Sequence, residues 1–347
     1  MNESTYLLPF LTSVVVTAIA IHFIRPFATH IGLVDAPSQR KDHSGEVPLV
    51  GGVAMFIAFS ITTLLFYPDL NEIREMILAL SIIITVGVLD DHHEISVRVR
   101  FLFQIIVGII MTEMAGVMLA DLGALLGPAQ SLSLGGWSAP FTVLAIIGVM
   151  NAMNMIDGID GLAGMMALVT LTALQILFLL AGSVSFIALV VSGAIIAFLW
   201  YNLFSQHKIF MGDAGSMFLG LVIAWTLVAS TQGEVRMMAP VTALWIFAVP
   251  LVDTVAIMVR RGLKGQSPFL PDREHLHHLF LRAGLSRRQT LLVVTGFALL
   301  FATVGVVGEW QKVPEWIMLL LFLTLFFTYV FALTHAWRLL KQIRKIF

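Results

Sequence analysis

The chain has 347 residues, of which 59% are hydrophobic and only 12% are charged; its net charge is −1 and it has no cysteine. Soluble domains carry roughly 25% charged residues, so this composition excludes an ordinary soluble protein. The lack of cysteine excludes disulfides and thiolate metal sites, and the near-zero net charge gives no indication of a nucleic-acid partner. We therefore expect an all-α polytopic integral membrane protein, with one membrane-embedded domain over residues 1–347.

Eleven apolar segments approach the roughly 20 residues that a helix needs to cross a bilayer. In chain order, we expect membrane-spanning helices over 6–24, 48–67, 76–89, 101–120, 138–153, 163–181, 185–204, 214–230, 239–259, 290–308 and 316–336. The connections between them are short, except for a basic loop rich in histidine at 260–289.

The positive charges lie on alternate connections. If the N-terminus is outside the cell, 17 of the 20 Lys and Arg residues fall on cytoplasmic segments. The positive-inside rule predicts this asymmetry, so we expect the N-terminus outside and the C-terminus in the cytoplasm. The unusual polar motifs described next all fall on the cytoplasmic segments, which predicts an active site on that face.

The first such motif is LDDHHE, in which Asp90 and Asp91 are adjacent at the end of an apolar segment. Two neighbouring carboxylates repel each other, and in a partly buried site one of them would have a raised pKa. A divalent cation would relieve this conflict, and oxygen ligands suit Mg²⁺ or Mn²⁺ better than Zn²⁺. The alternative is an ordinary acidic helix end at the membrane interface.

The second motif is NMIDGIDGLAG, which contains Asn154, Asp157 and Asp160. If the local backbone is helical, the three side chains share one face. The interspersed glycines would leave that face bare, so that a bulky anionic ligand could approach the backbone closely. The alternative is a flexible loop in which the acids cap the next helix.

Three further motifs lie on the same predicted face. Asp213, in MGDAGS, is either a metal ligand or a helix N-cap. The sequence HLHH places three histidines among basic residues, which suits phosphate binding better than Zn²⁺ because no Cys or HExxH pattern accompanies them. In GLVDAPSQRKDHSGEVPLVGG, Arg40, Lys41 and His43 are candidate phosphate ligands.

Acids that suit Mg²⁺ and bases that suit phosphate, on one face of a lipid-embedded protein, predict phosphoryl transfer with a lipid as one substrate. A transporter would place its charges near the bilayer midplane. Here only Asp253 is a candidate for that position, and a contact between helices would explain it as well as a substrate site would. An intramembrane aspartyl protease is a weaker alternative, because Phe210 replaces the first glycine of its GxGD pattern.

These motifs, together with PLVDTVAIMVRR and SPFLPDREHLHHL, resemble the polyprenyl-phosphate N-acetylhexosamine-1-phosphate transferases along nearly the whole chain. The resemblance implies Mg²⁺- or Mn²⁺-dependent transfer of GlcNAc-1-phosphate from UDP-GlcNAc to undecaprenyl phosphate, which gives undecaprenyl-diphosphate-GlcNAc and UMP. It also implies a bacterial inner-membrane location and the first step of lipid-linked O-antigen or enterobacterial common antigen synthesis. The resemblance does not decide which sugar is transferred, which pathway the product enters or whether the protein is a homo-oligomer. It also leaves two mechanisms open: direct attack of the lipid phosphate, or a covalent enzyme intermediate.

The resemblance also implies roles for individual residues. The catalytic candidates are Asp90, Asp91, Asp157 and Asp160, and the metal candidates are Asp213 and Asp91. The substrate-binding candidates are Asp35, Lys41, Asn154, His275, His277 and His278. One departure is His92, which stands where relatives often have an arginine after the acidic pair.

Overall fold

The computed structural model describes residues 4–35, 45–128, 130–233, 236–263, 265 and 275–343. Helices make up most of this part of the chain, and a short β-hairpin accompanies them. The elements are α1 (Ser4–Ile31), β1 (Val34–Asp35), β2 (Val47–Pro48), α2 (Gly51–Phe66), α3 (Arg74–His93), α4 (Val97–Ile109), the π-helix η1 (Ile110–Met114), the 3₁₀-helix η2 (Gly135–Trp137), α5 (Ser138–Ile156), α6 (Leu162–Leu180), α7 (Phe186–Leu203), α8 (Gly212–Thr231), α9 (Pro240–Ile246), α10 (Ala248–Leu263), α11 (Leu276–Arg282), α12 (Arg287–Trp310) and α13 (Glu315–Ile343).

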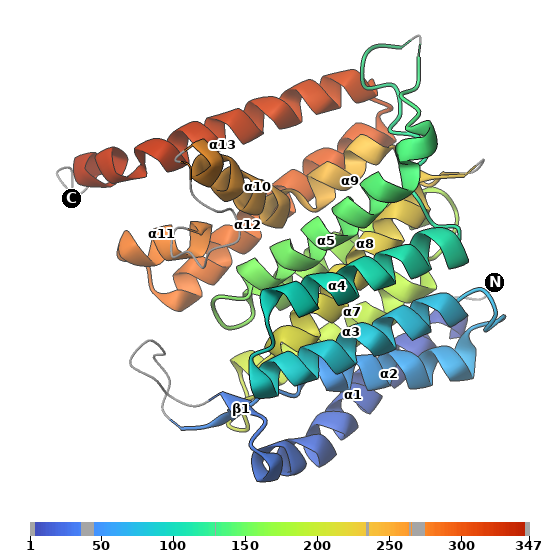
Figure 1. The fold of residues 1–347 in the computed structure, drawn as a ribbon, viewed down its shortest axis with the longest axis vertical. Helices are drawn as coiled ribbons and strands as arrows, with labels where there is room; N and C mark the ends of the chain where they lie inside the picture. The colour runs from blue at the N-terminus through green and yellow to red at the C-terminus, as the bar shows by residue number, and fades with distance from the viewer. Residues whose placement is uncertain are drawn as a thin grey trace.

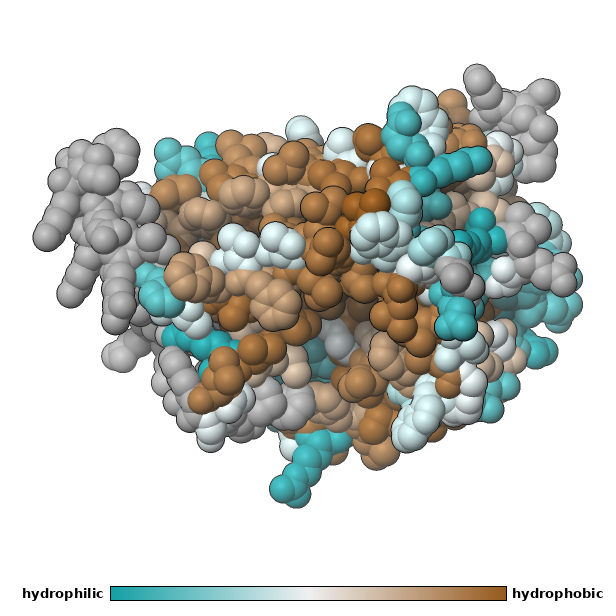
Figure 2. All heavy atoms as spheres, turned by 90° about the horizontal axis from the view of Figure 1, so that it is seen from above, coloured by the Kyte–Doolittle hydropathy of each residue, from teal (hydrophilic) through white to brown (hydrophobic). Residues whose placement is uncertain are grey.

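The helices confirm an all-α, multi-pass membrane protein. Within the described residues, eight helices are long and apolar enough to cross a membrane, and the bent pair α9–α10 makes a ninth if it counts as one span. Helix α2 is apolar but has only 16 residues. Apolar side chains cover the middle of the face seen in Figure 2, and most hydrophilic residues lie toward its two ends. The predicted number of eleven spans stays a prediction.

Several connections gather at one end of the helices. The hairpin at β1, the loop that follows α5, and α11 all lie on the left of Figure 1. Helix α1 begins at the opposite end, whereas α13 ends on the left side. The connections that carry most of the predicted site residues therefore share one end of the bundle.

Helix α8 is the centre of the bundle, because 94% of its apolar window is buried. Glycines allow two other helices to approach its first turn closely. A Cβ atom at Gly52 of α2 would lie 2.2 Å from the backbone nitrogen of Gly215, and one at Gly87 of α3 would lie 2.2 Å from Cα of Ala214. Small residues permit this kind of close helix packing in membranes. Asp213 lies in this tightly packed turn.

The β-hairpin is joined to the residues that precede α8. Strand β1 pairs antiparallel with β2, with Asp35 opposite Val47. Just after β2, the N–H groups of Gly51 and Gly52 donate to the carbonyls of Phe210 and Met211, both at 3.0 Å. These backbone bonds hold the entry into α8 against the start of α2.

The predicted span 239–259 differs from the structure, which has two helices, α9 and α10, that meet at 88°. Pro250 lies in the first turn of α10. Proline donates no hydrogen bond, and its ring clashes with the carbonyl four residues earlier, which here belongs to Ile246 at the end of α9. The segment 239–259 is therefore helical as predicted but broken near Phe247, and its role as one span stays a prediction.

The predicted span 101–120 is also too long, because the helix formed by α4 and η1 ends at Met114. Gly116 then has φ +66°. Side chains from other helices satisfy the backbone beyond it: Leu119 N–H donates to the hydroxyl of Thr142 at 2.8 Å, and Ala120 N–H donates to Gln232 Oε1 at 3.0 Å. These polar partners replace the helical hydrogen bonds that the apolar composition predicted.

Candidate active site

The last turn of α3 carries Asp90 and Asp91 in different directions, since successive side chains are about 100° apart around a helix. Asp90 is buried, and its Oδ2 lies 2.9 Å from Nη1 of Arg100 in α4. Asp91 instead accepts the backbone N–H of Asp213 at 2.7 Å and that of Ala214 at 3.2 Å. The two adjacent acids thus have different partners, one a cation and the other a helix N-terminus.

The contact with Asp91 requires a glycine immediately before Asp213. Gly212 has φ +73°, and a Cβ atom at this position would lie 2.4 Å from Oδ2 of Asp91. Only glycine combines this left-handed backbone with the close approach. The first N–H groups of a helix have no partner within the helix and favour a nearby negative charge, so Asp91 both caps α8 and fixes the place of Asp213.

Asp213 has two polar partners of its own. The amide of Asn154 donates to Asp213 Oδ1 at 2.5 Å, and it also contacts the hydroxyl of Ser216 at 3.0 Å. Nη1 of Arg100 lies 3.6 Å from Asp213 Oδ2. Arg100 therefore lies between Asp90 and Asp213, and Asn154 connects α5 to the same site as the sequence predicted.

The shared helical face of Asn154, Asp157 and Asp160 is not present in the structure. Helix α5 ends at Ile156, and Asp157 is its C-cap with φ −76° and ψ 48°. Asp160 lies in the following turn and pairs with Lys208 at 2.7 Å. The condition for a common face, a helical backbone over these residues, fails because the chain leaves the helix at Asp157.

Asp157 differs from the other acids because its carboxylate has no hydrogen bond or ion pair with any described residue. Removal from water, followed by the nearby carboxylates of Asp213 and Asp160, raises the pKa of Asp157 to about 7. We call Asp90, Asp91, Asp157 and Asp213 the acidic cluster. Arg100 compensates only part of its charge, and Asn154 adds a hydrogen bond to Asp213.

The histidine segment, residues 275–278, contacts the loop after α5 at Gly158, the residue that follows Asp157. His277 is 1% exposed, and it packs so closely on Gly158 that a Cβ atom there would lie 2.1 Å from Nε2 of His277. Burial lowers the pKa of His277 to about 3, and the neighbouring His278 adds to this effect. His275 is also buried and contacts Asp253 instead. The structure thus brings His277 of this segment into contact with Gly158 of NMIDGIDG.

The other candidates lie farther from the acidic cluster or outside the described residues. Asp35 lies in β1, in the hairpin that connects to the entry of α8. Lys41, with Arg40 and His43, lies outside the described residues. His92 directs Nε2 to the carbonyl of Ile31 at the end of α1, at 3.1 Å. The cation that pairs with Asp90 is thus Arg100 of α4, and not the residue at position 92.

Comparison with known proteins places this arrangement in a family. Residues 73–231, which contain α3 to α8, match the model of glycosyl transferase family 4. The undecaprenyl-phosphate alpha-N-acetylglucosaminyl 1-phosphate transferase of Haemophilus influenzae is 43% identical, with 99% of this chain and 96% of that protein covered. Proteins of the same name from Yersinia pestis and Escherichia coli K12 are 40% and 38% identical, over 92% and 100% of this chain and 89% and 96% of theirs.

The chain belongs to glycosyl transferase family 4. This confirms the family that the motifs predicted, and it identifies the chain as an enzyme of the phosphoglycosyltransferase kind.

Sequence reasoning missed two cations of this family 4 member, Arg100 and Lys208. In the sequence, Arg100 is indistinguishable from a positive-inside charge, although a short connection after the acidic pair brings it into the first turn of α4. Lys208 stands in KIFMGDAGS, five residues before Asp213. A rule that seeks a basic partner for each acid on the same face would have selected both.

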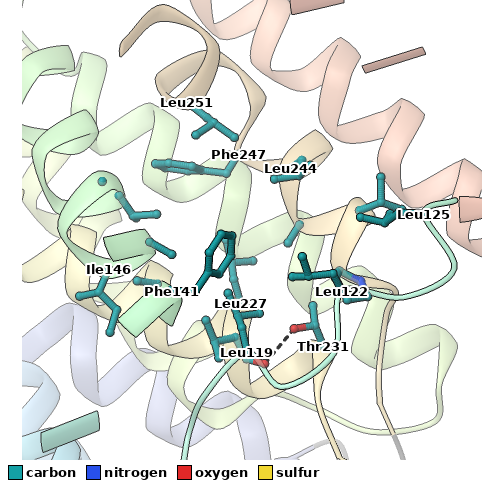
Figure 3. A pocket seen from close by; sticks show the side chains of 18 residues that line it. Leu119, Leu122, Leu125, Phe141, Ile146, Leu227, Thr231, Leu244, Phe247 and Leu251 are labelled. Atoms are coloured by element: carbon teal, nitrogen blue, oxygen red, sulfur yellow. Dashed lines mark hydrogen bonds between the residues drawn. The ribbon is translucent and has the colours of Figure 1, made fainter. Parts of the chain in front are cut away.

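The bundle of this family 4 member also contains an apolar cavity of about 310 Å³. Its walls come from α5, α8, α9, the start of α10 and the loop after η1, as Figure 3 shows. Lining residues include Leu119, Leu122, Phe141, Gly148, Leu227 and Phe247. Val149, which also lines the cavity, is less than two helical turns from Asn154. On α8 the first lining residue is Ala224, so the cavity lies farther along α5 and α8 than the acidic cluster.

We predict that Arg100→Ala lowers kcat/KM at least about 10²-fold, because it leaves the charges of Asp90 and Asp213 without their cation. Arg100→Lys should recover part of the activity, since it restores the charge without the planar fork. Arg98→Ala, at an exposed position of the same helix, is the matched control and should stay within about twofold. Steady-state kinetics on purified protein measure these values, and equal effects of the Arg98 and Arg100 variants would contradict the assignment.

We also predict that acidic pH destabilises the fold through His277. Its folded pKa of about 3 is below that of the unfolded chain, so the unfolded state binds more protons as the pH falls below about 6.5. Between pH 7 and pH 5, the loss is on the order of 2 kcal/mol. Thermal unfolding in detergent should show this dependence, and His277→Gln should remove it whereas the exposed control His30→Gln should not. A pH dependence unchanged in His277→Gln would refute the prediction.

Proposed function

We propose that this protein transfers N-acetylglucosamine 1-phosphate from UDP-N-acetylglucosamine to undecaprenyl phosphate and releases UMP. The observation that carries the proposal is the acidic cluster beside Arg100 at one end of an apolar bundle. Its relatives at 38–43% identity bear the name of this activity. A divalent cation bound to the diphosphate would be attracted to the acidic cluster, and the chain of a lipid substrate would pack in the apolar surroundings.

The residues of the acidic cluster fit a hard divalent cation, Mg²⁺ or Mn²⁺. Within the described part of the chain, no three His, Asp or Glu side chains by themselves form a group that could hold a metal ion. Mg²⁺ usually binds through one or two carboxylates together with substrate phosphates, so an incomplete protein site is what this ion requires. We propose that Asp213 and Asp91 hold it, since each Asp91 oxygen that accepts one N–H retains another lone pair.

The bound cation would neutralise the diphosphate of the sugar donor, and the chain's own groups would position the reactants. Arg100 can bind the phosphate of the lipid, because its side chain is 21% exposed and its Nη1 lies between Asp90 and Asp213. Once Arg100 turns to that phosphate, Asp90 is released to orient it and to accept its remaining proton. A phosphate oxygen of the lipid then attacks the β-phosphorus of the donor, and UMP leaves with the electrons of the cleaved P–O bond.

The same arrangement leaves different roles to the acids after α5. Asp157 faces the repulsion of Asp213 and has no partner of its own among the described residues, so we propose that it contacts the reacting groups. Asp160, which pairs with Lys208, would shape the loop around them. Direct attack predicts that no UMP forms without lipid acceptor; one equivalent of UMP, released from UDP-GlcNAc alone, would indicate a covalent intermediate instead.

For the membrane, we propose a bacterial inner-membrane location with the acidic cluster on the cytoplasmic face. The hairpin at β1, the loop after α5 and α11 lie together at one end of the bundle (Figure 1), and the connections predicted on that side carry 17 of the 20 Lys and Arg residues. UDP-sugars are cytoplasmic, so this orientation gives the site access to its donor. Lipid-linked O-antigen or enterobacterial common antigen synthesis is the process that such a product would start.

The decisive assay measures UMP release by purified protein with UDP-GlcNAc, undecaprenyl phosphate and a titration of Mg²⁺. We predict that activity requires the cation and that Asp213→Asn lowers kcat at least about 10²-fold, because electrostatic stabilisation of the reacting phosphates is lost. Asp69→Asn, at an exposed position remote in sequence from the acidic cluster, should leave kcat within about twofold. UDP-GalNAc in parallel tests the sugar. No UMP from either UDP-sugar would overturn the proposed function.

The apolar cavity suggests where the isoprenoid chain lies. Gly148 lines it, and a Cβ atom added at this residue would meet no other atom within 4 Å, so Gly148→Leu would fill the cavity without a clash. Since burial of one CH₂ group contributes about 0.8 kcal/mol, loss of two such contacts raises KM for undecaprenyl phosphate about tenfold. KM for a two-unit isoprenoid phosphate should not change.

Gly296→Leu, at an exposed glycine of α12 with open space around it, is the matched control for this experiment. It should leave both KM values unchanged. An equal rise for the long and the short acceptor in Gly148→Leu would contradict a chain site in the cavity.

A further inference from the structure

A buried polar junction outside the acidic cluster holds the histidine segment, residues 275–278. Asp253 of α10 is 2% exposed, and its Oδ2 lies 2.9 Å from Nδ1 of His275. Its Oδ1 accepts the backbone N–H of Leu276 at 3.0 Å and the hydroxyl of Tyr329 at 2.5 Å. One carboxylate thus joins α10, the start of α11 and α13.

This junction lies in apolar surroundings, where loss of its hydrogen bonds would be costly. Apolar residues pack beside it, among them Ala256, Ile257 and Leu333. A carboxylate removed from water in this way is costly unless donors satisfy it. Two of the three donors to Asp253 come from positions 275 and 276, so a movement of the histidine segment would leave the carboxylate poorly satisfied. The junction therefore opposes such movement.

The position of His275 is passed on to the active site through ring contacts. Its ring stacks on that of His277, with centroids 6.0 Å apart and an interplanar angle of 7°. His277 in turn packs on Gly158, the residue after Asp157. Both ring nitrogens of His277 are buried and have no hydrogen-bond partner among the described residues. A displaced His275 would therefore change where these nitrogens lie relative to Asp157.

Asp253 also sets the hydrogen positions on His275. An ionised carboxylate only accepts hydrogen bonds, so Nδ1 of His275 must carry the proton. Tyr329 can only donate to this carboxylate, because the carboxylate offers no hydrogen in return. An asparagine at position 253 keeps the shape and an Oδ1 acceptor for Leu276 and Tyr329, but its Nδ2 donates, so Nδ1 of His275 can no longer donate to it.

We propose that Asp253 and Tyr329 are positioning residues that fix the histidine segment against Gly158 and thereby set the affinity for the nucleotide sugar. That this segment binds the nucleotide sugar is implied by the family resemblance and rests on the proposed function. Neither residue needs to touch the substrate, since both act through His275. Both residues lie outside residues 73–231, the part of the chain that matches the family model.

The test compares Tyr329→Phe and Asp253→Asn with Tyr67→Phe in the full-length enzyme. Tyr67 also has a hydrogen-bonded hydroxyl, with Glu72 as partner, but it lies after the far end of α2. We expect KM for UDP-GlcNAc to rise about fivefold in Tyr329→Phe, the effect of one hydrogen bond, and at least about tenfold in Asp253→Asn, where Nδ1 of His275 loses its charged acceptor. KM for undecaprenyl phosphate should not change, and kcat should stay within about twofold.

Two further measurements separate positioning from a general loss of stability. Adding Tyr329→Phe to Asp253→Asn should produce no additional rise in KM, because both act through the same contact. Backbone amides of residues 276–282 should exchange hydrogen faster in both single variants than in Tyr67→Phe. A variant that only reduced the amount of folded enzyme would lower the apparent kcat and leave KM and the amide exchange of this segment unchanged.

His277→Ala distinguishes failure of this inference from failure of the proposed function. If His277→Ala raises KM for UDP-GlcNAc while Tyr329→Phe and Asp253→Asn change neither KM nor exchange, the positioning role is overturned and the role of the segment stands. If His277→Ala leaves KM unchanged, the segment does not bind the nucleotide sugar. In that case the link between Asp253, Tyr329 and donor affinity is overturned as well, whatever the exchange data show.

Discussion

The hydrogen bonds from the first turn of α8 to the carboxylate of Asp91 are the contact on which the rest of the site depends. Helix α8 is the buried centre of the bundle, and its first N–H groups would be left without partners in apolar surroundings. Asp91 satisfies them only because Gly212 permits the approach. This contact sets the place of Asp213, and through it those of Arg100 and Asn154.

The site is built with an excess of negative charge. Arg100 pairs with Asp90 and approaches Asp213, whereas Lys208 pairs with Asp160 in the adjacent turn. Asp157 has no such partner among the described residues, and a charge kept in a partly buried site without compensation is costly. In the proposed function, a divalent cation and a diphosphate would offset that cost, since Mg²⁺ usually binds through one or two carboxylates together with substrate phosphates.

Polar and apolar chemistry share the same helices. Helices α5 and α8 carry Asn154 and Asp213 toward one end and walls of the apolar cavity farther along. The bend between α9 and α10 gives Phe247 to the cavity and Asp253 to the junction that holds the histidine segment. A substrate with a phosphate head and an isoprenoid tail would use both parts.

The sequence by itself determined the membrane class, the family and the main acids, because composition, charge asymmetry and short motifs depend on neighbours along the chain. Tertiary structure decided which side chains pair: Arg100 with Asp90, Lys208 with Asp160, and His275 with Asp253. It also decided the bend at Pro250 and the early end of the helix at Met114. These features depend on side chains distant in sequence and on backbone turns at glycines, whose direction no spacing rule specifies.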